Sequence, residues 1–229
     1  MSKVLIFGGT TEGREALSNY PDAVMCVTSS YAASLLPPGT DCRIGRLNAD
    51  EMLSFMQTLQ PDRVIDATHP YAAAVSANIR SCCLRLHVPL TRIERPAEPG
   101  AWRSLVVHVP DAAAAAAAAA RSPGNVLLTT GSQTLSSFTA AVSRDRLYAR
   151  VLPTVESLTR CIDAGLLPSH IIAMQGPFSA AFNDALYDLL QIQVMVTKDS
   201  GTAGGIEEKV LPALSKGIDV IVIDRPDRN

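Results

Sequence analysis

Short apolar runs recur along the chain, and longer segments of mixed character separate them. Val4–Phe7 consists of four apolar residues in a row, which is typical of a parallel strand buried on both faces. Comparable segments follow at intervals to the end of the chain. The predicted strands are Val4–Phe7, Val24–Thr28, Cys42–Ile44, Arg63–Asp66, Leu90–Ile93, Val106–Val109, Val126–Thr130, Leu147–Val151, Ile171–Met174, Val194–Thr197 and Val220–Ile223.

Helix signals fall between these strands. Asn48 followed by Glu51 predicts an N-cap with its reciprocal partner, and the helix continues through Leu59. Pro61 ends it, because proline lacks the N–H that a helix interior needs. A longer helix is predicted from about Ala72 to His87.

The nine alanines after Asp111 favour another helix, since Asp111 can cap it and alanine has the best helix propensity. The segment Glu94–Ser104 holds Pro96, Pro99 and Gly100 and lacks periodicity, which indicates a linker. We therefore expect an α/β fold of two Rossmann-like units with mostly parallel sheets. The expected domains are residues 1–98 and 99–229, with the active site in the cleft between them.

Composition excludes several classes of protein. The net charge of −2 and the absence of a basic block argue against nucleic-acid binding. No apolar run is long enough for a membrane span, and no signal peptide is apparent, so we expect a cytoplasmic protein with no membrane partner. Five cysteines without C-x-x-C spacing indicate reduced thiols, and the four scattered histidines predict no metal site. Sixteen arginines against four lysines suit an anionic ligand, although codon bias gives the same ratio.

A glycine-rich turn follows the first strand. Gly8, Gly9, Thr10, Thr11, Glu12 and Gly13 stand where the chain passes from strand to helix. Backbone N–H groups and the positive end of a helix then converge on one point, which suits a phosphate. Thr10 replaces the middle glycine of the dinucleotide fingerprint, so a purely structural turn is the alternative.

The fourth strand ends in a polar segment that contains Asp66, Thr68, His69 and Tyr71. Ligands of parallel sheets bind at the carboxyl ends of the strands, and histidine exchanges protons near neutral pH. The alternative is that Asp66 and Thr68 cap the next helix while His69 only packs.

Three strands of the second half also end in glycines next to hydroxyl groups or lysine. This pattern is typical of anion sites, although ordinary loop turns are the alternative for each. The residues concerned are Ser132 after one strand, Gly176 and Ser179 after another, and Lys198, Ser200 and Gly201 after a third.

Several of these segments, taken in order, resemble the precorrin-6A reductases of cobalamin biosynthesis. The similarity covers nearly the whole chain, and the segment 66–72 is its most specific part. Residues 26–36 are more similar to the branch that acts on cobalt-precorrin-6A. The matching segments are 8–15, 45–47, 66–72, 92–96, 176–178, 197–201 with Gly204 and Gly205, and 224–226.

The resemblance implies an NAD(P)H-dependent oxidoreductase that acts on a CH–CH group. Hydride transfer to one double bond of a corrinoid precursor would give precorrin-6B or its cobalt form. It implies His69 and Tyr71 as catalytic candidates. Cofactor-binding candidates are Gly8, Gly9, Thr10, Thr11, Glu12, Gly13, Ser29, Ser30, Asp66 and Thr68. Candidates for the substrate carboxylates are Arg92, Ser132, Arg150, Gly176, Ser179, Lys198, Ser200 and Gly201.

The choice between NADPH and NADH stays open, because Thr28, Ser29 and Ser30 after the second strand include neither an acidic residue nor an arginine. A non-catalytic nucleotide-sensing module and an S-adenosylmethionine-dependent tetrapyrrole methyltransferase are the alternative functions. We expect a monomer and leave a homo-oligomer open.

Overall fold

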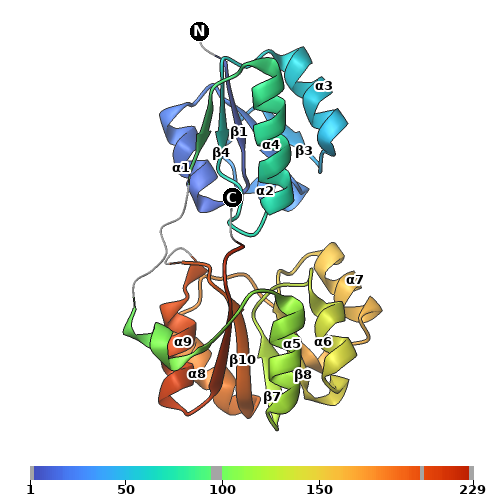
Figure 1. The fold of residues 1–229 in the computed structure, drawn as a ribbon, viewed down its shortest axis with the longest axis vertical. Coiled ribbons are helices and arrows are strands. Elements are labelled where there is room, and N and C mark those ends of the chain that lie inside the picture. The colour runs from blue at the N-terminus through green and yellow to red at the C-terminus, as the bar shows by residue number, and fades with distance from the viewer. Residues whose placement is uncertain (1–2, 94–99, 202–203, 227–229) are drawn as a thin grey trace. The chain divides into compact units, whose positions relative to one another are not determined.

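The computed structural model describes residues 3–93, 100–201 and 204–226 (Figure 1). The chain divides into two compact units, with the described residues up to 93 in unit 1 and those from 100 onward in unit 2. The predicted domain boundary and residues 94–99 of the predicted linker lie outside the described residues. Within the described ranges, every helix is too short or too polar to cross a bilayer.

Unit 1 is built on a five-stranded parallel sheet with the order β3-β2-β1-β4-β5. The strand order reverses between β1 and β4, so the turns after these two strands lie at the topological switch point, where open α/β sheets bind ligands. The predicted strands of the first half are confirmed to within one residue. The strands are β1 (Val4–Phe7), β2 (Val24–Val27), β3 (Cys42–Ile44), β4 (Arg63–Asp66) and β5 (Leu90–Arg92).

Helices cover both faces of this sheet. They are α1 (Thr11–Asn19), α2 (Ser30–Ser34), α3 (Ala49–Leu59) and α4 (Ala73–Leu86). Ile6 packs in a buried cluster with Leu17 of α1, whereas the neighbouring Leu5 packs with Met52 of α3 and Ile79 of α4. Both faces of β1 are therefore buried, which explains its unbroken apolar sequence.

The cap predicted for α3 is confirmed. The Asn48 side chain accepts a hydrogen bond from the Glu51 backbone N–H at 2.9 Å, and the Glu51 carboxylate accepts one from the Asn48 N–H at 2.9 Å. Two backbone donors that the helix leaves unpaired are thus satisfied by side chains, which fixes where α3 begins.

Unit 2 is a second parallel sheet, with the order β6-β11-β10-β7-β8-β9. Its switch point lies between β7 and β10, where the chain reverses its direction of winding. The strands predicted for the second half are confirmed to within two residues. They are β6 (Val107–Val109), β7 (Asn125–Leu128), β8 (Leu147–Val151), β9 (Ile171–Ala173), β10 (Ile192–Lys198) and β11 (Asp219–Ile223).

Eight helical segments surround the sheet of unit 2 in the described residues. They are η1 (Ala101–Leu105), α5 (Ala112–Arg121), α6 (Leu135–Ala141), η2 (Arg144–Arg146), α7 (Val155–Asp163), η3 (Pro168–His170), α8 (Ala180–Leu189) and α9 (Glu207–Ser215). Tyr187 of α8 and Val210 of α9 pack with Met195 on one face of the sheet. The alanine run forms α5 as predicted, because Asp111 accepts a hydrogen bond from the Ala114 N–H at 2.8 Å, and α5 contacts β6, β10 and β11.

The predicted linker is wrong at its C-terminal end. Residues 101–105 form the 3-10 helix η1, and Trp102, which is 2% exposed, packs into the core of unit 2 with Ile206 and Val210. The burial of the large indole supplies enough apolar area to hold this short segment, although the sequence around it has no helical periodicity.

Candidate active site

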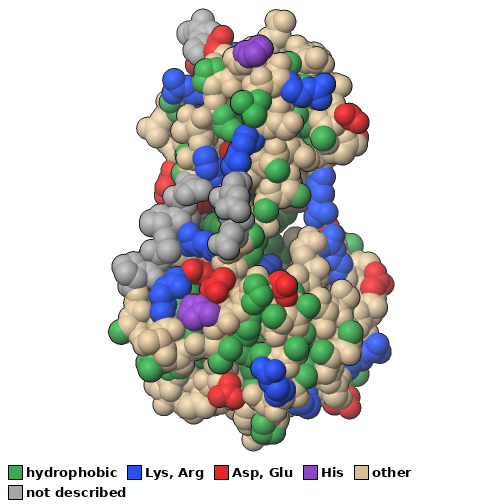
Figure 2. Space-filling view, in the orientation of Figure 1, with side chains coloured by type: hydrophobic (Ala, Val, Ile, Leu, Met, Phe, Trp, Pro, Cys, Tyr) green, Lys and Arg blue, Asp and Glu red, His purple; other side chains and the backbone are tan. Residues whose placement is uncertain are grey.

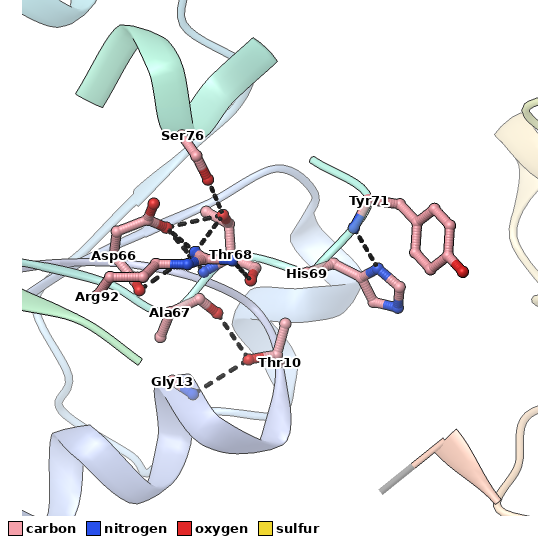
Figure 3. A network of polar contacts seen from close by, with 9 residues as sticks. All are labelled: Thr10, Gly13, Asp66, Ala67, Thr68, His69, Tyr71, Ser76 and Arg92. Atoms are coloured by element: carbon pink, nitrogen blue, oxygen red, sulfur yellow. Dashed lines mark hydrogen bonds and ion pairs between the residues drawn. The ribbon is translucent and has the colours of Figure 1, made fainter. Parts of the chain in front are cut away.

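The glycine turn of unit 1 joins β1 to α1 in a tightly packed arrangement (Figure 3). A Cβ on Gly8 would lie 2.5 Å from the carbonyl oxygen of Ala67, and one on Gly13 would lie 2.5 Å from that of Gly8. A Cβ on Gly9 would lie 2.9 Å from the Cβ of Ala32 on α2. Glycine is therefore required at all three positions for the turn, β4 and the two helices to approach one another.

Thr10, where the fingerprint has a glycine, is the N-cap of α1. Its hydroxyl accepts a hydrogen bond from the Gly13 N–H at 3.1 Å and donates one to the carbonyl of Ala67 at 2.8 Å. The threonine thus begins the helix and ties the turn after β1 to the turn after β4. The remaining N–H groups of the first turn have no partner within the helix itself, as at any helix start.

The other predicted cofactor residues lie around this turn. Ser29 is the N-cap of α2 and accepts a hydrogen bond from the Ala32 N–H at 3.2 Å, and Ser30 is the first residue of α2. Thr11 and Glu12 form the first turn of α1, and the Thr11 hydroxyl accepts a hydrogen bond from Arg14. The structure therefore brings the predicted residues that follow β1 and β2 together at one edge of the sheet.

Asp66 of β4 and Arg92 of β5 lie opposite each other on adjacent strands, and their side chains form an ion pair within unit 1. Asp66 is 2% exposed, and its Oδ1 also accepts hydrogen bonds from the Thr68 N–H at 3.0 Å and from the Thr68 hydroxyl at 2.7 Å. Arg92 donates to the hydroxyl of Thr68 at 2.9 Å and to its carbonyl at 3.0 Å, and Ser76 of α4 lies 3.1 Å from the same hydroxyl. These contacts hold the turn after β4 in place (Figure 3).

His69 and Tyr71 lie beyond this network, with their rings on the side of the turn away from Asp66 and Arg92 (Figure 3). The ring centroids are 5.6 Å apart, and the Nδ1 of His69 accepts a hydrogen bond from the Tyr71 N–H at 3.3 Å. An accepting Nδ1 carries no proton, so the neutral imidazole carries its proton on Nε2. The backbone thereby selects the tautomer.

The predicted residues of unit 2 lie at or just beyond the carboxyl ends of four of its strands. Lys198 ends β10, where burial lowers the pKa of its ammonium group. Ser200, 8% exposed, lies 3.5 Å from the ammonium of Lys209. Gly201 has a φ of +64°, a conformation that favours glycine.

The remaining predicted residues occupy the neighbouring strand ends. Ser132 follows β7 and lies 3.5 Å from the hydroxyl of Ser157. Gly176 precedes a cis proline, and Ser179 is the N-cap of α8. Arg150 lies on β8 and is 7% exposed.

Sequence reasoning missed a second ionic cluster in unit 2. Asp199, 4% exposed, pairs with Arg103 of η1 and lies 3.7 Å from the guanidinium of Arg225, while His108 of β6 contacts Asp224 at 2.7 Å. The sequence contains a partial signal for this cluster. Asp199 adjoins the predicted Lys198, and residues 224–226 are among the segments that resemble the precorrin-6A reductases. Their convergence follows from the neighbouring positions of β6, β11 and β10.

Two open parallel sheets, with a glycine turn opening a helix at the switch point of the first, define an α/β protein of two Rossmann-like units. The model of the family described as "Precorrin-6x reductase CbiJ/CobK" matches residues 3–229. The chain belongs to this reductase family.

Relatives along the whole length agree with this assignment. The cobalt-precorrin-6A reductase of Salmonella typhimurium is 38% identical, over 97% of this chain and 87% of that protein. The precorrin-6A reductase of Rhodobacter capsulatus is 33% identical, over 99% and 89%. The solved structure of a CobK precorrin-6A reductase has a TM-score of 0.78 at 31% identity, covering 100% of this chain and 90% of that one.

Proposed function

We propose that this protein reduces one carbon–carbon double bond of cobalt-precorrin-6A, with NADPH as the cofactor. The observation that carries the proposal is the match to the reductase family over residues 3–229. The cobalt form is favoured because a relative with that name reaches 38% identity, against 33% for one that acts on precorrin-6A.

Gly8 to Gly13, with Thr10 as the cap, would hold the pyrophosphate at the start of α1. The fit rests on the glycines, since a Cβ at Gly9 or Gly13 would fill the space in which the turn, α1 and α2 meet. A bound reduced nicotinamide supplies the hydride for the reaction.

NADPH is favoured by the end of β2. Thr28, Ser29 and Ser30 offer no carboxylate to a ribose hydroxyl, and the Gly45 N–H donates to the carbonyl of Val27 at 2.9 Å. This hydrogen bond places the backbone of the following residue, Arg46, next to the end of β2. A phosphate on the ribose of the cofactor would be bound at that strand end.

His69 is the proposed proton donor, because its imidazolium form can release a proton near neutral pH and return to the neutral imidazole. The proton would go to the ring carbon next to the one that accepts the hydride, which completes the reduction. Tyr71 would fix the imidazole through its backbone N–H. Asp66, Thr68 and Arg92 hold each other, so we assign them to positioning this turn.

The carboxylates of the macrocycle would be bound by unit 2, through Lys198, Ser200 and Gly201 after β10 and through Arg150, Ser132, Gly176 and Ser179 on the neighbouring strands. The switch point between β7 and β10 favours this edge of the sheet.

The reaction is tested by following the absorbance of reduced nicotinamide when precorrin-6A or its cobalt form is supplied. We expect consumption of NADPH that depends on the macrocycle and is faster with the cobalt form. Stabilisation by S-adenosylmethionine without NADPH oxidation would contradict the proposal and support a methyltransferase.

The cofactor is tested separately by the ratio of the NADPH and NADH affinities. Arg46→Ala should lower this ratio by about tenfold, because a charge-assisted contact to the phosphate is lost. Arg85→Ala, which changes an exposed arginine of α4, is the matched control and should leave the ratio unchanged.

A further inference from the structure

Arg150 is a buried cation with an unusual set of partners. It lies near the carboxyl end of β8 and is 7% exposed. Its Nη1 donates a hydrogen bond of 2.7 Å to the Oδ1 of Asn183 on α8, and its guanidinium carbon lies 4.3 Å from the centre of the Phe178 ring. One end and one face of the planar group are thus held by the protein.

The Asn183 amide is itself fixed. It is fully buried, and its Nδ2 donates to the carbonyl of Ser179 at 3.0 Å and to that of Glu208 at 2.9 Å. Because both amide hydrogens are used, the oxygen must face Arg150, and the guanidinium orientation is set by helices α8 and α9.

No carboxylate among the described residues pairs with Arg150. The titratable group that interacts with it, Tyr187, is a phenol whose pKa is raised by burial, so it is neutral near pH 7. Buried charges in proteins are normally paired, because desolvation of a lone ion is expensive. Arg150 therefore lacks the counter-charge that such a site requires.

The Nε and Nη2 groups of Arg150 have no hydrogen-bond partner in the described residues, and neither is among the polar atoms sealed from solvent. These two N–H groups form the side edge of the guanidinium, which matches the two oxygens of a carboxylate. The edge that recognises a carboxylate is the one the protein leaves accessible.

We infer that Arg150 is the anchor for a carboxylate of the ligand, bound side-on through Nε and Nη2, with Phe178 and Asn183 holding the guanidinium in place. The inference rests on the proposed function for the identity of the ligand, an acetate or propionate group of the macrocycle. It selects Arg150 among the substrate candidates and names the group that it recognises.

Binding of uroporphyrin, a stable tetrapyrrole with acetate and propionate groups, tests the anchor without catalysis. Its dissociation constant from the intact protein can be followed by the change in its absorbance. Arg150→Met should raise that constant at least tenfold, and Arg150→Lys should raise it less, because lysine keeps the charge but loses the fork. Arg160→Met, which removes a partly exposed arginine of α7 paired with Glu156, should leave it unchanged.

The same variants are then assayed with the macrocyclic substrate. We expect the KM of Arg150→Met to rise at least tenfold while its NADPH affinity stays the same. A contact that holds the substrate and the transition state equally well affects KM and leaves kcat unchanged. An unchanged uroporphyrin constant and an unchanged KM in folded Arg150→Met, or no uroporphyrin binding by the unaltered protein, would overturn the inference. If uroporphyrin binding depends on Arg150 but neither macrocycle is reduced, the anchor stands and the proposed reaction fails.

Discussion

The two units each have an arginine near the carboxyl end of a parallel strand, and the two arginines differ in their partners. Arg92 of unit 1 is neutralised by the buried Asp66 and donates further bonds to Thr68, so its guanidinium is used by its own unit. Arg150 of unit 2 is more deeply buried and has an amide and an aromatic ring as partners. Arginine near the carboxyl end of a strand thus holds a turn in one unit and is left with an accessible edge in the other.

The contrast extends to the surroundings. Figure 3 shows that the polar side chains after β4 contact one another, which leaves His69 and Tyr71 on the far side of a rigid turn. In the view of Figure 2, lysine and arginine side chains are scattered over the surface and no extended basic patch appears. The net charge of −2 gives no long-range attraction for an anion, so the proposed recognition of the substrate by unit 2 would depend on individual cations such as Arg150.

The largest expected effect tests whether unit 1 carries the proton transfer. His69→Ala should lower kcat by about 10²–10⁴, the usual contribution of a positioned proton donor. Tyr71→Phe keeps the ring and the backbone N–H, so its kcat should change little. Stopped-flow oxidation of NADPH with saturating substrate measures both, and an unchanged kcat in His69→Ala would reduce that residue to a packing role.

The second prediction concerns stability and compares the two arginines directly. Arg92→Met leaves Asp66 buried without its cation and should lower the free energy of unfolding by about 2–3 kcal/mol, less than for a fully buried pair because Arg92 is partly exposed. Arg150→Met leaves the buried Oδ1 of Asn183 without its donor, but it also removes a buried charge that has no counter-ion, so the two effects offset and the net loss should be about 1 kcal/mol. Urea denaturation measures both, and equal losses would contradict the distinction between the two arginines.

The third prediction separates the cofactor from the substrate. Gly13→Val should weaken NADPH binding at least tenfold, about 1.4 kcal/mol, because the new side chain meets the carbonyl of Gly8. Binding is measured by fluorescence titration of protein first shown to be folded by circular dichroism. Gly217→Ala, at a turn of unit 2 where a Cβ has open space but φ is +70°, serves as the control, because any backbone strain it adds lies outside unit 1. If folded Gly13→Val binds NADPH with unaltered affinity, the pyrophosphate is not bound at this turn.

The smallest effect is expected at Lys198. Lys198→Ala should raise the KM for the macrocycle severalfold and leave kcat and NADPH affinity nearly unchanged. Burial lowers the pKa of this lysine, so the cation is lost at a lower pH than for an exposed lysine. The KM should therefore rise on the alkaline side, and this rise should be absent in Lys198→Ala. If the KM does not depend on pH in either protein, substrate binding belongs to the other strand ends.

Most of the fold could be predicted because both faces of each sheet are covered. The central strands must then be continuous apolar runs, and caps such as Asn48 with Glu51 lie within four residues of sequence. The pairs that define the candidate site join residues far apart, as Asp66 does with Arg92 and Arg150 with Asn183. No local pattern encodes these pairs, so both arginines read from the sequence simply as cations for an anionic ligand.

The packing of helix α5 depends little on which of its alanines face the sheet. Ala115, Ala116, Ala118 and Ala119 face the interior, and the residues between Asp111 and Arg121 are all alanine. Adding or deleting one alanine would turn the following part of the helix by about 100°, given 3.6 residues per turn, yet a methyl group would again face β11. A change in the length of this tract would thus preserve the chemistry of the buried face, and its cost would fall on the loop that leads to β7.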